Sequence, residues 1–246
     1  MNGRRRSAAA SAAWRTMLLA VSFGHAALAQ TTSVDTVTIA QLYPPAVAAA
    51  LSRTLPADRA VKFHVRVPPG EGPHGVLVFV SAHGDAQPPE EWPAVLDRHD
   101  LVWVSAEGFG NDEFGAQRVL VTLMALEHVK RLVPLDRQRL YVGGMAGGGR
   151  IASQALTRFP GFFSGALCLL GADFVAPEPP LAPELAGKRV VFASRAGDAN
   201  RREIRAAYSR FVDVGVQRAH LLELGDYGHV VPDGEELDEA LTLLER

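Results

Sequence analysis

Two observations in the sequence predict an α/β layered domain with a mainly parallel central sheet. Short apolar runs recur along the chain, and several are almost uninterrupted by polar residues, as in strands buried on both faces of a sheet. Amphipathic segments with helical spacing lie between these runs, and the apolar stripe of each needs a sheet face to cover. No internal repeat and no long linker divides the chain after Gln30.

The expected strands are Val61–Val67, Gly75–Val80, Leu101–Ser105, Leu140–Gly143, Ser164–Leu170, Arg189–Ala193 and His220–Leu224. The expected helices are residues 39–55 (disturbed by Pro44-Pro45), Phe114 to about Arg131, and stripes at Ile151–Phe159, Ile204–Phe211 and Leu237–Leu244.

Composition excludes several classes of protein. Of the 246 residues, 48% are hydrophobic and 21% charged, which is typical of a globular chain. The 25 basic and 27 acidic residues give no positive excess, so we expect neither nucleic acid nor an anionic membrane surface as a partner. Cys168 is the single cysteine, which excludes an intramolecular disulfide framework and a multi-cysteine metal site.

The N-terminus has the pattern of a secretory signal peptide. Four arginines precede an apolar run that begins at Met17, and Ala27-Leu28-Ala29 offers the small residues that signal peptidase reads. We therefore expect a signal peptide over residues 1–29 and a mature start at Gln30. The alternative, a membrane anchor, needs roughly 20 apolar residues, and polar residues interrupt this run from Ser22 onward. Cleavage would leave 21 basic against 27 acidic residues, a net charge of −6, on a secreted or periplasmic protein without a membrane span.

A glycine-rich turn links the strand ending at Gly143 to the following helix. Gly144 and Gly148 flank Ala146 at −2 and +2, which is the G-x-S-x-G spacing of a nucleophile elbow between a strand and a helix. The apex residue is alanine instead of serine.

The stretch from Val76 to Phe174 resembles the polyhydroxybutyrate-depolymerase and feruloyl-esterase-like branch of the α/β-hydrolases. Tyr141–Gly149 is similar to the elbow of that branch except for the serine, and Arg158–Ala166 resembles its helix end and next strand. The resemblance implies an α/β-hydrolase domain over residues 61–246, after an N-terminal extension over residues 30–60.

The same resemblance implies the remaining site residues. Asp198 follows the strand after which the family places its acid, and His229 matches the base in the loop after the last strand. The N–H of Gly147, next to the apex, is the expected first oxyanion donor. A second comes from the loop Ser81–Gly84, where His83 is the candidate. Taken singly, an Asp in such a turn is often only a turn residue and a loop His only solvated, but both stand in the family's order.

The missing hydroxyl decides the functional prediction. Serine hydrolysis needs an oxygen that His229 can deprotonate and that then carries the acyl group, and Ala146 has none. We expect an exported α/β-hydrolase-fold protein, catalytically impaired or inactive, that binds an ester, an acylated polymer or glycan, or a protein partner in an open cleft. Two alternatives stay open: a working hydrolase that uses His229-activated water or a substitute hydroxyl such as Ser81, and a serine-to-alanine variant of a true esterase.

Two further expectations concern ligands. No phosphate-binding loop ending in Lys-Ser/Thr and no metal-ligand cluster occurs, so we expect no cofactor and no metal. Only about 18 residues, rich in proline at Pro177–Pro180, separate strands Ser164–Leu170 and Arg189–Ala193. That stretch is too short for a lid domain, so the cleft should be open. The oligomeric state has no signal in the sequence.

Overall fold

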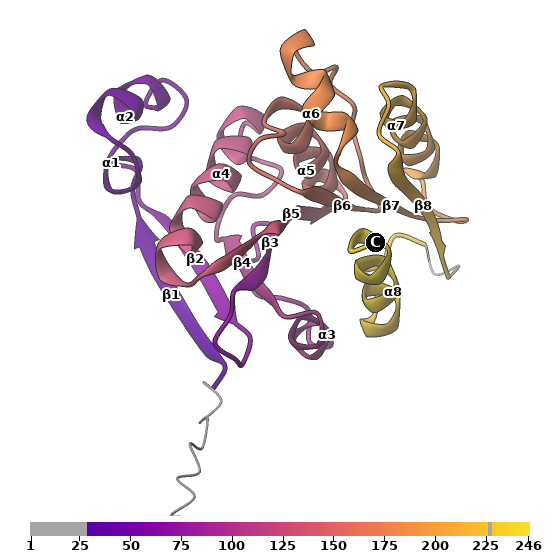
Figure 1. Ribbon diagram of the computed structural model, residues 1–246, viewed down its shortest axis with the longest axis horizontal. Coiled ribbons are helices and arrows are strands. Elements are labelled where there is room, and N and C mark those ends of the chain that lie inside the picture. Colours follow the sequence, from indigo (N-terminus) through magenta and orange to yellow (C-terminus); the bar gives the residue numbers. More distant parts are fainter. Residues whose placement is uncertain (1–28, 226–227) are drawn as a thin grey trace, which may run out of the picture.

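A computed structural model describes residues 29–225 and 228–246 (Figure 1). Its centre is an eight-stranded sheet with the order β1-β2-β4-β3-β5-β6-β7-β8. The pairs from β4 to β8 are parallel, whereas β2 runs antiparallel to both β1 and β4. The expectation of a mainly parallel sheet is therefore confirmed. The strands are β1 (Thr31–Val37), β2 (Val61–Val67), β3 (His74–Val80), β4 (Leu101–Ala106), β5 (Leu135–Met145), β6 (Gly165–Leu169), β7 (Arg189–Arg195) and β8 (Arg218–Leu224).

Helices cover both faces of the sheet, as Figure 1 shows. One face carries α4, α5 and α7, and the other carries α3 and α8, which contact each other. The α-helices are α1 (Ile39–Leu42), α2 (Pro45–Leu51), α3 (Trp92–Arg98), α4 (Gly115–Leu132), α5 (Gly147–Arg158), α6 (Ala182–Ala186), α7 (Arg201–Asp213) and α8 (Gly234–Leu244), with a 3₁₀ turn η1 (Pro179–Leu181).

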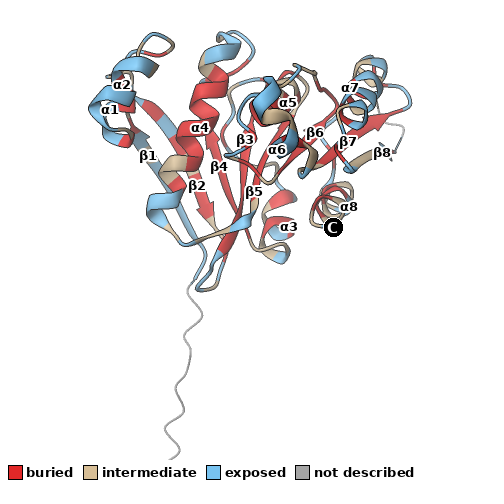
Figure 2. Ribbon diagram, turned by 45° about the horizontal axis from the view of Figure 1, so that its top comes forward, coloured by how far each residue is buried: buried red, intermediate tan, exposed pale blue. Residues whose placement is uncertain are grey.

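Two apolar cores lie on the two faces, because the central strands are buried on both sides. Strands β3 and β4 alternate their side chains between the cores: Val76 and Val78 face the α4 side, and Leu77 faces the α3 side with Trp103. Figure 2 shows the central strands as the most continuously buried part of the molecule, whereas α2 is largely exposed. This layered core fixes the carboxyl ends of the parallel strands, where loops meet.

Four elements did not appear in the sequence-based expectation: strand β1, helix α3, the 3₁₀ turn η1 and the short helix α6. Strand β1 pairs with β2 in full register, from Thr31 opposite Val67 to Val37 opposite Val61, so part of the N-terminal extension belongs to the main sheet. Helix α3 follows the proline-rich loop after β3. The helical stretch expected over residues 39–55 is two short helices, broken where Pro44 and Pro45 follow Tyr43.

The predicted signal peptide lies outside the described residues except for Ala29. Within residues 29–225 and 228–246, no helix has the length and hydropathy to cross a bilayer.

Candidate active site

The turn between β5 and α5 has a strained backbone at its apex. Ala146 has φ 53° and ψ −118°, a region that residues with a Cβ rarely adopt. Its N–H donates to the carbonyl of Leu169 on β6 at 2.8 Å, and its carbonyl accepts from the N–H of Arg150 at 3.2 Å. Such a conformation costs roughly 1–3 kcal/mol and persists only where the surrounding structure fixes it. The strain therefore marks residue 146 as a specially placed position.

Glycines make this sharp turn possible because backbones approach closely around it. A Cβ on Gly148 would lie 1.8 Å from the carbonyl oxygen of Val80, and one on Gly144 would lie 2.4 Å from the backbone of Gly148. These distances are far inside van der Waals contact. The spacing of glycines at −2 and +2 from Ala146 therefore has a steric cause in this fold.

The predicted acid and base are in direct contact. Nδ1 of His229 lies 2.6 Å from Oδ2 of Asp198 and is hydrogen-bonded to it. The side chain of Asp198 is fully buried, and its other oxygen accepts from the N–H of Asn200 at 2.6 Å. The side chain of His229 is 43% exposed. A buried carboxylate on Nδ1 orients the imidazole and leaves Nε2 outside this hydrogen bond.

Helices α3 and α8 hold the loop that carries His229. The indole N–H of Trp92 donates to the carbonyl of Pro232 at 2.9 Å, and the N–H of Gly234 donates to Glu91 Oε2 at 2.8 Å. These two contacts anchor the C-terminal half of the loop to α3.

A buried ion pair anchors the loop's other end. Arg195 is 1% exposed and donates to both carboxylate oxygens of Glu236, at 2.8 and 2.6 Å. It also donates to the carbonyl of Gly225, whose N–H donates back to Glu236. Bidentate pairs of this kind are geometrically specific. The start of the loop is therefore fixed against β7 and α8.

Ala146 and His229 line one cavity of about 440 Å³ at the carboxyl edge of the sheet. Most of the wall is apolar. The remaining lining residues come from β3, the loop after it, α3, the end of β5 and the loop of His229: Phe79, Ser81, Ala82, His83, Asp85, Gln87, Pro88, Pro89, Trp92, Met145, Val230 and Val231. The segment between β6 and β7 contributes none of these residues. No lid domain is evident in the described part of the chain, in agreement with the expected open cleft.

The two predicted oxyanion donors, Gly147 and His83, differ in whether their N–H groups are already hydrogen-bonded. Gly147 is the first residue of α5, so its N–H has no acceptor within the helix. The N–H of His83 already donates to Ser81 Oγ at 3.1 Å. The preceding residue, Ala82, also lines the cavity, and its N–H makes no hydrogen bond to any residue that the structure describes. The free N–H in this loop is therefore that of Ala82, one residue before His83, the donor predicted from the sequence.

Ser81 has a structural task in the same loop. Its Oγ accepts from the N–H of both His83 and Asp85, at 3.1 and 3.2 Å. A hydroxyl that caps two backbone donors holds the turn in place. This arrangement disfavours Ser81 as a substitute nucleophile.

Sequence reasoning missed Arg118, a buried arginine beneath the site. Its guanidinium donates to the carbonyls of Ser81 at 2.9 Å and Phe109 at 3.2 Å, and to Asn111 Oδ1 at 3.0 Å. Burial lowers the pKa of this guanidinium, although nearby Asp112 raises it. Arg118 thus ties together the loops after β3 and β4. Its only signal in the sequence is a single charge at the start of the apolar stretch of α4.

The described residues hold no group of three or more His, Cys, Asp or Glu side chains placed to bind a metal ion. The lone thiol, Cys168, is fully buried, and burial raises its pKa to about 12. It is therefore a packing residue in the core.

No protein-family model matches the chain, and no curated protein sequence matches it. Solved structures do match. A ferulic acid esterase aligns over 89% of this chain and 98% of its own, with 15% identity and a TM-score of 0.64. An S-formylglutathione hydrolase from Staphylococcus aureus aligns over 89% and 98%, with 12% identity and a TM-score of 0.59. A serine-to-alanine mutant of an α/β-hydrolase enzyme from the metagenome of Lake Arreo, Spain, aligns over 87% and 82%, with 14% identity and a TM-score of 0.58.

These similarities, with the sheet order and the elbow, define the class of the molecule: it has an α/β-hydrolase fold related to that of esterases. The fold class predicted from the sequence is confirmed. At 12–15% identity the likeness shows the fold alone, because one fold can carry many different activities.

Proposed function

We propose that this protein binds an ester-bearing ligand in the cleft over Ala146 and does not turn it over through an acyl-enzyme. One observation carries the proposal: the strained apex, with Ala146 at φ 53°, shares a cavity with His229, whose Nδ1 is held by Asp198, and the apex side chain has no oxygen. The methyl group of Ala146 thus stands where a serine hydrolase of this fold has its nucleophilic hydroxyl.

The physical consequence is large. A methyl group supplies neither the lone pair that attacks the ester carbonyl nor the proton that His229 would take. In a serine protease, removal of the nucleophile alone lowers turnover about a millionfold, and the residual rate comes from oxyanion stabilisation and binding. Here Gly147 and Ala82 are the proposed donors of that oxyanion hole. Their N–H groups would still polarise a bound carbonyl.

The shape and polarity of the cleft suggest the ligand class. The wall is mainly apolar, and Val230 and Val231 are about half exposed at its rim. An open, apolar-walled cleft suits the acyl group of an acylated polymer or glycan better than a small lipid sealed from water. The feruloyl-esterase-like resemblance of the sequence agrees with such a ligand, and export through the predicted signal peptide would place the protein where these polymers occur.

A second candidate function rests on His229 itself. Asp198 engages Nδ1, whereas Nε2 has no hydrogen-bond partner among the described residues. A water could be held at Nε2 beside the methyl of Ala146. His229 would then act as a general base, and the water would be the nucleophile that attacks activated esters. Slow hydrolysis that requires His229 but forms no covalent intermediate is the signature of this route.

Restoring the oxygen tests the proposal. The native protein should not hydrolyse p-nitrophenyl butyrate above the heat-denatured control, and a fluorophosphonate probe should not label it. Ala146→Ser should acquire both properties, because the hydroxyl would lie where His229 can deprotonate it.

The control is Ala146→Ser combined with His229→Ala, which should lose the acquired activity while keeping the fold. Probe labelling of the native protein at another residue contradicts the proposal. So does an Ala146→Ser variant that folds and remains unlabelled, because that result would show that residue 146 does not face a competent base.

A further inference from the structure

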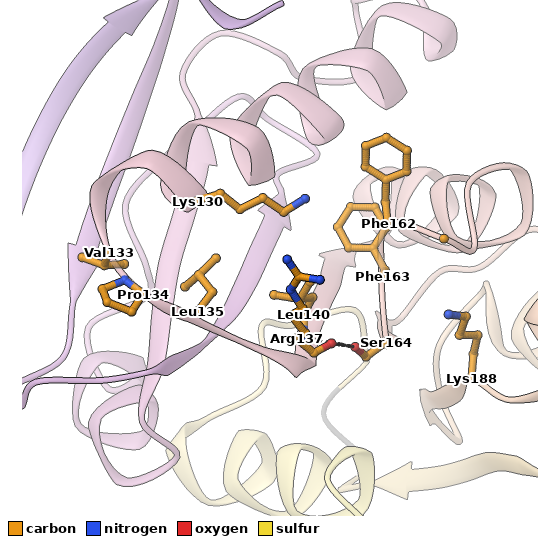
Figure 3. A pocket seen from close by; sticks show the side chains of 11 residues that line it. Lys130, Val133, Pro134, Leu135, Arg137, Leu140, Phe162, Phe163, Ser164 and Lys188 are labelled. Atoms are coloured by element: carbon orange, nitrogen blue, oxygen red, sulfur yellow. Dashed lines mark hydrogen bonds between the residues drawn. The ribbon is translucent and has the colours of Figure 1, made fainter.

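A second cavity lies at the other end of β5 from Ala146 (Figure 3). Its volume is about 510 Å³, within the range of small-molecule sites, which is roughly 300–1,000 Å³. Leu135 and Leu140 of β5 line it, as does the loop between α5 and β6. Leu140 precedes Ala146 by six residues, so along an extended strand the two sites are separated by about 20 Å. The cavity is therefore distinct from the cleft over Ala146.

Every ionisable side chain that lines this cavity is cationic: Lys130 of α4, Arg137 of β5 and Lys188 before β7. Figure 3 shows Lys130 and Arg137 on one side of it, and the amine of Lys188 approaching from the other. The whole chain carries more acidic than basic residues, 27 against 25, so this concentration of positive charge runs against the overall composition. Three cations around one cavity create a local field that favours anions.

The carboxylates nearby neutralise this charge only in part. Lys130 pairs with Glu127 at 2.6 Å, one turn earlier on α4, in an i,i+3 pair of the partly exposed kind that contributes little. Burial lowers the pKa of Lys188, and Glu184 offsets that effect. Arg137 is exposed, and none of the ion pairs among the described residues involves it. The cavity therefore keeps a net positive charge.

The loop between α5 and β6 adds an aromatic surface to the cavity, the ring of Phe162. The amine of Lys130 lies 5.6 Å from the centre of the Phe162 ring, so aromatic and cationic groups are adjacent. Ser164 Oγ donates to the carbonyl of Arg137 at 2.8 Å, which fixes this loop against β5 (Figure 3). A ligand with an apolar ring and anionic groups would match both surfaces.

We propose that this cavity binds a small organic dianion, with phosphate or carboxylate groups held by Lys130, Arg137 and Lys188 and an aromatic or apolar part against Phe162. A guanidinium and two ammonium groups are the side chains that proteins use for such anions. The site is independent of the chemistry at Ala146, so it neither supports nor requires the proposed function of the cleft.

Isothermal titration calorimetry at constant ionic strength tests this site with two probes, phenyl phosphate and phthalate. The full chain should bind at least one of them saturably, one to one. Binding of both assigns the shared dianion chemistry, and binding of one assigns the phosphate or the carboxylate class. Benzyl alcohol, which is neutral, should not bind.

The variants Arg137→Gln and Lys188→Gln should each weaken binding roughly ten-fold, the usual scale for loss of one charged hydrogen-bond donor. The matched control is Arg202→Gln, which removes one exposed cation from α7, outside the cavity. Thermal melting of each variant verifies folding. No binding of either probe to the native chain overturns the proposal. Equal weakening by all three variants also overturns it, because that result indicates general charge attraction.

Discussion

The indole nitrogen of Trp92 lies 2.9 Å from the carbonyl oxygen of Pro232, three residues after His229. Trp92 is 1% exposed and stands in α3, 140 residues before its partner. Its ring packs edge-on against Phe79 and Trp103, with centroid distances of 5.3 and 5.9 Å. One side chain thus joins the floor of the cleft to the loop that carries the base.

Trp92→Phe should destabilise the protein by about 2 kcal/mol, because it removes a hydrogen bond and leaves a cavity in the core. Hydrogen exchange followed by mass spectrometry should show faster exchange in residues 228–233. Trp103→Phe is the matched control, since Trp103 is equally buried and its indole donates to Ala86 at 2.9 Å. That control should increase exchange in the loop after β3 instead. Unchanged exchange in residues 228–233 of Trp92→Phe would contradict the anchoring role.

Ala146→Gly should raise the free energy of unfolding by about 1 kcal/mol. Glycine adopts φ 53° without the steric cost that alanine bears, and this relief of roughly 1–3 kcal/mol exceeds glycine's greater loss of chain entropy. The comparison is Ala206→Gly, at an exposed position inside α7, which should cost about 1 kcal/mol. Urea unfolding should show a higher free energy of unfolding for Ala146→Gly and a lower one for Ala206→Gly, each compared with the native chain. Equal destabilisation by both would show that Ala146 is not strained.

Gly148→Ala should prevent the elbow from forming. The added Cβ would lie 1.8 Å from the Val80 carbonyl oxygen, so β3 and α5 must separate, at a cost of more than about 3 kcal/mol. Gly187→Ala is the control, because its Cβ would meet only the Glu184 carbonyl oxygen, at 3.7 Å. Circular dichroism and thermal melting distinguish the two, and a native-like melting temperature for Gly148→Ala would refute the close approach.

Stability should depend on pH through His99, which connects the end of α3 to the end of α8. The hydrogen bond that His99 donates to Glu245 raises the pKa of His99 above its ordinary 6.5, against the opposing effect of burial, and Asp238 adds to the rise. A raised folded-state pKa means that the protonated form stabilises the fold. This contribution is complete below about pH 6.5 and is lost as the pH rises through the raised value.

The measurement compares the free energy of unfolding of the native chain and His99→Gln across pH 5–9. The difference should be largest at the acidic end and should shrink as the pH rises. Glu245→Gln should reduce the same pH dependence, because it removes the hydrogen-bond partner at 2.8 Å. A difference that grows with pH would contradict the assignment.

Strands β3, β4, β6 and β7 were predictable because they are buried on both faces and read as apolar runs, and β2 because buried apolar residues alternate with polar ones along it. Val61–Val67 agrees in both bounds, and the helix expected from Phe114 to about Arg131 is Gly115–Leu132. Strand β1 escaped prediction for the opposite reason. It is an edge strand whose side chains are mostly exposed, so Thr31–Val37 has no apolar run to reveal it. β1 is fixed by its pairing with β2, which begins 24 residues after β1 ends, and the local sequence of β1 does not reveal that pairing.

The contact between the predicted acid and base was predictable because the order of the elements fixes both positions. The positions of Asp198 and His229 follow from the strands that precede them, and the structure brings their side chains to 2.6 Å. The oxyanion loop was less accessible, because a shift of one residue changes which N–H is free, and Ser81 occupies that of His83. Arg118 was not predictable, since its acceptors come from separate loops that meet only in the folded molecule.

The most direct test of the central claim is the intact mass of the native protein after incubation with p-nitrophenyl butyrate and rapid acid quenching. Because residue 146 offers a methyl group to the ester, we predict an unchanged mass at every time point. The Ala146→Ser variant should show a transient butyryl adduct on residue 146. A butyryl adduct on a side chain of the cleft in the native protein would contradict the account, because it would reveal a nucleophile other than the missing serine.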